Sequence, residues 1–203
     1  MSKQFLARYG SPKIQDKLVN DPDNYVRWIM AKHGNDSHRD KLVNDPDNYV
    51  RSNIVEHGNN SHRDKLINDK SADVRKNVAQ YGNNDHKDKL IDDKNYKVRK
   101  VIAVHGTDAH RDKLINDEEP EVRLKIAKYG NDEHRHKLID DEDSDIREEI
   151  AISGNDTHRD KLIKDNHPSV RYRVSQYGND VHRDKLKNDQ SEMVSNHANR
   201  SRK

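Results

Sequence analysis

The sequence predicts an all-α solenoid of about eight 24-residue repeats, each holding two helices. The first observation is a histidine in the segment HRDKL, or a close variant of it, which returns every 24 residues without insertion or deletion. It stands at His38, His62, His86, His110, His134, His158 and His182. The second is a glycine column with the same step, which uses all eight glycines: Gly10, Gly34, Gly58, Gly82, Gly106, Gly130, Gly154 and Gly178. A strict period of this length indicates stacked units that bury their apolar faces against one another.

Composition alone would suggest a poorly ordered chain. Only 30% of the residues are apolar and 37% are charged, with one Trp and one Phe. Such chains bury too little apolar surface to offset their conformational entropy. A solenoid needs only a thin continuous core between neighbouring repeats, so the periodicity favours an ordered structure.

The first half of each repeat predicts a helix of about twelve residues. Each repeat begins with an aspartate, at Asp21, Asp45, Asp69, Asp93, Asp117, Asp141, Asp165 and Asp189. Aspartate is a good N-cap, and Pro22 follows where the first helical residue would stand. The sixth, tenth and thirteenth places, for example Val122, Ile126 and Tyr129, then lie on one side of a helix. The glycine at the fourteenth place is expected to end this helix in the left-handed conformation.

The second half predicts a shorter helix, α or 3₁₀, because only about two turns separate its start from the next repeat. Its expected N-caps are Asp36, Asn60, Asn84, Asp108, Asp132, Asp156 and Asp180. Its expected core anchors are Leu42, Leu66, Leu90, Leu114, Leu138, Leu162 and Leu186. One long and one short helix per repeat, stacked side by side, make an α-solenoid.

We expect one repeat domain over residues 1–203, with atypical ends. Residues 1–20 form a partial N-terminal cap unit, in which Phe5, Leu6 and Tyr9 could cover the open core. Residues 21–188 form seven full repeats, and residues 189–203 form a partial C-terminal unit with a frayed polar tail. Atypical terminal units are how repeat arrays close their cores.

The stretch DPDNYVRWIMA, with its D-P-D-x-x-V-R-x-x-V/I-A frame and its 24-residue period, resembles the variant leucine-rich repeat and short HEAT-like repeats. The resemblance implies alternating α- and 3₁₀-like helices in a right-handed superhelix. Some variant leucine-rich repeat proteins hold a cysteine-bound iron–sulfur cluster. This chain has no cysteine, so no cofactor is expected. HEAT-like folds serve as protein scaffolds, and one branch comprises DNA glycosylases, but no catalytic pattern of that branch matches here, so we expect no enzyme.

One recurrent column is arginine, at Arg27, Arg51, Arg75, Arg99, Arg123, Arg147 and Arg171. Guanidinium groups in a row would suit a phosphate ligand. The alternative is that each arginine pairs with the aspartate that begins an adjacent repeat. The equal period of the two columns favours this structural ladder.

The histidine column suggests chemistry that the spacing does not support. HRD is part of a protein-kinase signature, yet Asn44 follows Asp40 at the wrong interval and no glycine-rich loop is present. Equivalent histidines in stacked helices would lie about 8–10 Å apart, too far to share a metal ion. We therefore expect half-buried packing histidines beside the leucine anchors and no metal site.

The residues that differ from repeat to repeat, at the eighth, ninth and twelfth places, are the candidates for partner binding. The predicted partner-binding residues are Trp28, Lys32, Lys76, Lys100, Lys125, Glu148, Glu149, Tyr172 and Arg173. An exposed tryptophan is a typical interface anchor. The alternative for this surface is that members such as Ile29 and Val104 only widen the core.

These features predict a non-enzymatic scaffold that docks a protein partner along its helical face. The alternative is a nucleic-acid-binding protein that uses the basic ends of the chain and five basic residues, namely Lys76, Lys97, Lys100, Arg111 and Lys113. The net charge is only +2, and residues 117–140 and 141–164 sum to −2 and −4, so the basic surface is interrupted. A small-molecule ligand is not expected, because solenoids seldom offer a closed apolar pocket. No signal segment or membrane-length apolar run occurs, so no membrane contact and a cytoplasmic location are expected.

Overall fold

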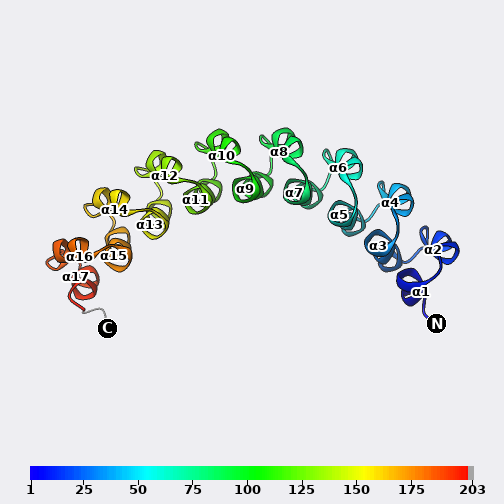
Figure 1. The fold of residues 1–203 in the computed structure, drawn as a ribbon, viewed down its shortest axis with the longest axis horizontal. Coiled ribbons are helices and arrows are strands. Elements are labelled where there is room, and N and C mark those ends of the chain that lie inside the picture. Colours follow the sequence, from blue (N-terminus) through cyan, green and yellow to red (C-terminus); the bar gives the residue numbers. More distant parts are fainter. Residues whose placement is uncertain (201–203) are drawn as a thin grey trace. The chain divides into compact units, whose positions relative to one another are not determined.

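A computed structural model describes residues 1–200, and it confirms the predicted all-α repeat fold (Figure 1). The described residues hold 17 α-helices and no strand. They divide into two compact units, one ending at Gly106 and one beginning at Thr107. The prediction of a single repeat domain over residues 1–203 stays a prediction, as does the right-handed sense of the superhelix.

In the first unit, long and short helices alternate. The helices in the first row are α1 (Lys3–Tyr9), α3 (Asn24–His33), α5 (Asn48–His57), α7 (Ala72–Tyr81) and α9 (Tyr96–His105). Those in the second row are α2 (Pro12–Leu18), α4 (Asp36–Leu42), α6 (Asn60–Leu66) and α8 (Asn84–Leu90). Within the unit, α3, α5 and α7 each pack against the long-row helices before and after them and against the short helix that follows. The long-helix row lies on the inner side of the bend within this unit (Figure 1).

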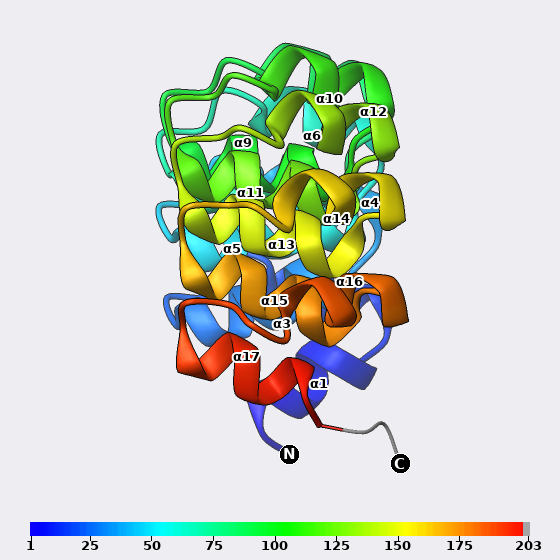
Figure 2. The same ribbon diagram turned by 90° about the vertical axis from the view of Figure 1, so that its left-hand side faces the viewer.

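The second unit repeats this arrangement. Its short helices are α10 (Asp108–Leu114), α12 (Asp132–Leu138), α14 (Asp156–Leu162) and α16 (Asp180–Leu186). Its other helices are α11 (Pro120–Tyr129), α13 (Ser144–Ser153), α15 (Pro168–Tyr177) and α17 (Glu192–Ala198). Figure 2 shows α11, α13, α15 and α17 one beside the next, with the short helices in a parallel row. The predicted frayed tail is helical as far as Ala198, and its last three residues, 201–203, lie outside the described part of the chain.

The long helices have ten residues and begin two places later than predicted. Asp23, not Asp21, is the N-cap of α3, and its carboxylate accepts a hydrogen bond from the backbone N–H of Tyr25 at 2.9 Å. Asp21 instead accepts from the N–H of Asp23 at 3.0 Å, an Asx-type turn that sets the chain up to enter the helix. Pro22 therefore precedes the helix.

The short helices also begin one residue away from the predicted caps. Asn35, not Asp36, is the N-cap of α4, and its side chain accepts from the N–H of His38 at 3.0 Å. His38 completes the capping box, because its Nδ1 accepts from the backbone N–H of Asn35 at 3.2 Å. Among the described residues, every short helix is α-helical, so the 3₁₀ form that the resemblance implies does not occur there.

The core uses the sixth, tenth and eleventh places of the repeat, all three of which lie on the long helix. Val122, Ile126 and Ala127 of α11 are fully buried, whereas Tyr129 at the thirteenth place is 47% exposed. The sequence therefore located two of the three core columns, but the thirteenth-place assignment was wrong and the small residues at the eleventh place were missed. At the N-terminus the expected cover is likewise different, because Phe5 and Tyr9 are 48% and 62% exposed while Ala7 is buried.

The glycines do not adopt the predicted left-handed conformation. Gly130 has φ −75° and ψ 175°, an extended backbone open to any residue, and no glycine of the described chain has a positive φ. Glycine is required here because neighbouring atoms leave no room for a Cβ atom. A Cβ at Gly130 would lie 2.5 Å from the carbonyl oxygen of Ile126 and 3.0 Å from Cβ of His134. The turn from the long helix into the short helix therefore has no room for a side chain at the glycine position.

Candidate functional site

The arginine column forms the predicted structural ladder. Arg51 donates from Nε and Nη2 to the two oxygens of Asp69, at 2.6 and 2.8 Å, and both side chains are buried. The same pairing joins Arg27–Asp45, Arg75–Asp93, Arg123–Asp141, Arg147–Asp165 and Arg171–Asp189. Burial raises the pKa of Asp69, but the hydrogen bonds from Arg51 and from the N–H of Ser71, together with the positive charges of Arg51 and Lys70, hold the pKa below its ordinary value of 3.8. Each pair therefore fastens one repeat to the next as a charged, bidentate clamp.

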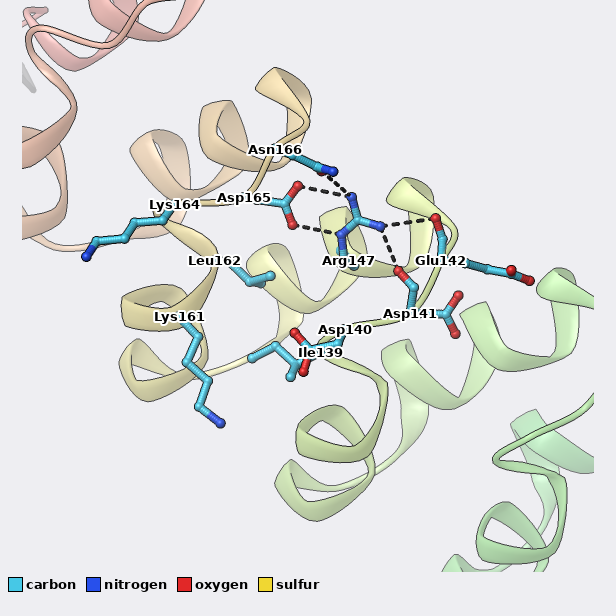
Figure 3. A pocket seen from close by; sticks show the side chains of 10 residues that line it. All are labelled: Ile139, Asp140, Asp141, Glu142, Arg147, Lys161, Leu162, Lys164, Asp165 and Asn166. Atoms are coloured by element: carbon cyan, nitrogen blue, oxygen red, sulfur yellow. Dashed lines mark hydrogen bonds and ion pairs between the residues drawn. The ribbon is translucent and has the colours of Figure 1, made fainter.

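Arg147 shows why these arginines do not bind a phosphate. It borders an open depression of about 460 Å³ in the second unit (Figure 3). Its Nε and Nη2 donate to Asp165, Nη1 donates to the backbone carbonyls of Asp141 and Glu142, and Nη2 also donates to Asn166. All five N–H donors of the guanidinium are thus satisfied within the protein. Similar depressions recur beside Arg51 and Arg75, so this feature belongs to the repeat frame.

The histidine column is structural and more deeply buried than a half-buried packing role would require. His158 is 4% exposed, its Nδ1 accepts from the backbone N–H of Asn155 at 3.2 Å, and Nε2 lies 3.2 Å from the carbonyl oxygen of Asp132. The ring is therefore neutral, with its proton on Nε2. Within the described residues, no group of three or more His, Asp or Glu side chains is placed to hold a metal ion.

We expect the free energy of unfolding to fall as the pH drops below about 6.5. Burial lowers the pKa of His86 and His158 from 6.5, although nearby Asp64 and the Asp132 carbonyl oppose the shift. The unfolded chain then binds more protons than the folded chain, so the stability these rings give is complete above pH 6.5 and is lost below it. Urea unfolding at pH 7.5 and 5.5 measures the difference. Replacing both histidines with Gln should reduce it, and an unchanged difference would contradict this origin.

In the first unit, the predicted partner-binding residues lie along the long helices and are partly exposed. Trp28 stacks on Tyr25 with ring centroids 5.7 Å apart, and the ammonium of Lys32 lies 5.3 Å from the Trp28 ring centroid. Lys76 pairs with Asp73 at 3.1 Å, and Lys100 lies 5.5 Å from the ring centroid of Tyr96. Trp28 and Lys32 thus come together, with Lys76 and Lys100 on later helices.

In the second unit, the structure brings together part of the predicted set. Arg173 of α15 pairs with Glu148 of α13 at 3.1 Å and lies 5.9 Å from the ring of Tyr172. Glu149 accepts a hydrogen bond from Ser153 at 2.6 Å. Lys125 lies on the preceding helix, α11, and is partly exposed. The alternative that some variable positions widen the core holds for Ile29, which is 5% exposed.

Two aromatic residues that the sequence analysis did not select adjoin Trp28. Tyr25 and Tyr49, at the fifth place of consecutive repeats, are 56% and 70% exposed. With Trp28 they border an open depression of about 240 Å³ between α3 and α5. The signal was available in the sequence, because the fifth place of the other full repeats holds no aromatic residue.

The fold and the ladder define the chain as an α-solenoid repeat protein, and comparison with known proteins agrees at that level. No family model and no curated protein matches the sequence. Among solved structures, one described as a leucine-rich repeat variant with a novel repetitive structural motif matches with a TM-score of 0.83, at 19% identity, over 97% of this chain and 83% of that chain. The chain therefore shares the fold of that variant, as the resemblance of its repeats predicted.

Two engineered proteins are less similar. One, an engineered protein from a structural genomics consortium, has a TM-score of 0.41 and 16% identity over 97% of this chain and 78% of its own. The other, a designed armadillo repeat protein in complex with the peptide (KR)4, has a TM-score of 0.27 and 18% identity over 92% and 95%. Separately, every helix in the described part of the chain is too short or too polar to cross a bilayer.

Proposed function

We propose that the chain is a non-enzymatic, cytoplasmic binding module that docks a protein partner along its long helices. The observation that supports this is the different placement of constant and variable residues within the repeat. The recurrent Arg, His and Asp columns pair within the frame, while the residues that change from repeat to repeat are mostly half-exposed on the long helices. A constant frame with a variable face suits recognition of an extended protein segment.

The variable residues have the chemistry of a protein interface. Trp28 with Tyr25 in the first unit, and Tyr172 with Arg173 in the second, are of the types that most often dominate interface energies. Glu149 adds negative charge in the second unit, where Glu148 pairs with Arg173. Nucleic-acid binding through Lys76, Lys97, Lys100, Arg111 and Lys113 is the alternative. It has less support, because Lys76 and Arg111 already pair with Asp73 and Asp108.

Trp28→Ala is expected to weaken capture of the partner by about tenfold or more, because loss of a central aromatic anchor typically costs at least 1–2 kcal/mol of binding. The immobilised chain would be exposed to an extract of the source cells, and the recovered protein titrated against each variant. Tyr81→Ala is the matched control. It removes an exposed ring from α7 at the thirteenth place of the repeat, outside the variable eighth, ninth and twelfth places. Glu148→Ala with Glu149→Ala tests the second unit in the same way.

Two outcomes would contradict the proposal. One is equal capture by wild type, Trp28→Ala and the double glutamate variant, with folding verified by circular dichroism. The other is recovery of nucleic acid alone, with an affinity that falls steeply as salt is added, as counterion release requires.

A further inference from the structure

The depression between α3 and α5 is built from aromatic rings and one carboxylate. Asn24, Tyr25 and Trp28 line it from α3, and Asp47, Tyr49 and Val50 line it from the start of α5. The Tyr25 and Trp28 rings are nearly parallel, at 12°. The chain's single Trp and two of its eight Tyr thus border one depression of about 240 Å³.

The repeat frame does not require this cluster. At the place of Tyr25 and Tyr49, the other full repeats have Asp73, Lys97, Glu121, Asp145 and Ser169. These side chains do not contribute to the core, because the first four are exposed and Ser169 is only half-buried. Exposure of large aromatic rings to water is unfavourable. Rings that are half or more exposed and cluster at one point therefore indicate a contact surface.

The charge in the lining of the depression is negative, while the ammonium of Lys32 stands outside that lining, 5.3 Å from the Trp28 ring centroid. Asp47 is the charged residue among those that line it in the described chain. Its carboxylate accepts from the N–H of Tyr49 at 2.7 Å and from the amide of Asn24 at 2.5 Å. The Asn24 hydrogen bond holds the pKa of Asp47 below 3.8, so the group is ionised at neutral pH. No guanidinium or ammonium lines the depression among the described residues, which disfavours an anionic occupant.

We propose that this depression is a subsite for one cationic side chain, lysine or arginine, of the docked protein partner. The inference rests on the proposed function, since it names the group that the partner inserts. Aromatic faces attract a cation through their quadrupoles, and an adjacent carboxylate adds charge attraction and hydrogen-bond acceptors. A purely apolar side chain would contact the rings but would have no charge attraction to the Asp47 carboxylate.

The single Trp makes the test specific, because tryptophan fluorescence of the whole chain reports on Trp28 alone. The probe is an acetylated, amidated pentapeptide with a central lysine between glycines, titrated against the same peptide with norleucine in place of lysine. The lysine peptide is expected to change Trp28 emission saturably, with an apparent affinity about tenfold above that of norleucine. Equal responses to the two peptides, or no saturable response to lysine, would overturn the inference.

Variants separate the two attractive groups. Tyr49→Ala and Asp47→Asn should each weaken the lysine response several-fold, and asparagine still caps α5. Tyr49→Phe should keep the response, and Tyr81→Ala should not affect it. Weakening by Tyr81→Ala equal to that by Tyr49→Ala would contradict the assignment.

The closing comparison uses the captured partner. If Tyr49→Ala and Asp47→Asn bind the partner as well as wild type while Trp28→Ala does not, the subsite inference fails and the docking proposal stands. If the wild-type chain captures no protein although the lysine peptide binds, the docking proposal fails instead. Loss of partner capture in Tyr49→Ala and Asp47→Asn, with Tyr49→Phe unaffected, is the result expected.

Discussion

Arg51→Met is expected to lower the free energy of unfolding by about 3–5 kcal/mol, the usual cost of removing one partner of a buried ion pair. The Arg51 and Asp69 side chains are 4% and 5% exposed. Without the guanidinium, the Asp69 carboxylate stays buried and keeps only the hydrogen bond from the N–H of Ser71. The carbonyl of Asp45 also loses the donor that lies 2.6 Å away. Urea unfolding followed by circular dichroism measures the change.

Lys65→Met is the matched control. Lys65 pairs with Asp40 at 2.6 Å, as close as Arg51 to Asp69, but its side chain and that of Asp40 are 47% and 53% exposed. An exposed pair contributes only about 0–1 kcal/mol, so this variant should stay near wild type. The double variant Arg51→Met with Asp69→Asn should cost less than the sum of the two single changes, because neither charge is then left unpaired. Similar costs for Lys65→Met and Arg51→Met would contradict the assigned role of the ladder.

Gly130→Ala is expected to cost about 2–4 kcal/mol, as forced overpacking against fixed backbone does. The new methyl group would lie 2.5 Å from the Ile126 carbonyl oxygen, which itself accepts the N–H of Gly130 at 2.8 Å. Relief requires breaking the end of α11 or moving His134 out of its capping box. Thermal or urea unfolding measures the loss.

Gly130→Asn distinguishes the two explanations for this glycine. Asparagine is tolerated where a helix ends in the left-handed conformation, so it would cost less than alanine there. In the extended conformation observed, its Cβ meets the same carbonyl, so it should cost at least as much as alanine. Lys128→Ala, at an exposed place of the same helix, should stay within about 0.5 kcal/mol. Tolerance of both substitutions at Gly130 would contradict the close-approach argument.

The features that the sequence predicted correctly are those that depend on the spacing of residues along the chain. The 24-residue period located the two helices of each repeat, and the equal step of the Arg and Asp columns predicted pairs such as Arg147–Asp165. It misplaced the caps because candidates stand next to one another, as Asp21 stands near Asp23 and Asn35 beside Asp36. Propensity ranks these residue types almost equally, so only backbone geometry decides among them.

Residue spacing alone could not predict the role of the histidines or part of the candidate site. A capping box normally uses Glu or Gln to reach back to the N-cap, so His38 did not suggest one. The variable eighth, ninth and twelfth places of the repeat indicated Trp28, but Tyr25 and Tyr49 stand at the fifth place, outside those columns, and were not predicted. Their contribution depends on the lateral packing of α3 against α5, which brings rings from two repeats to one depression.

The ladder has a consequence for how such a chain can change in length. Each of the ladder pairs described above joins residues 18 apart, from one repeat to the next. Excision of residues 45–68 would place Asp69 where Asp45 stood, within reach of Arg27, and all remaining pairs would keep their spacing. Loss or gain of whole repeats by recombination therefore preserves the Arg–Asp pairing, whereas a change whose length is not a multiple of 24 residues breaks it at the junction.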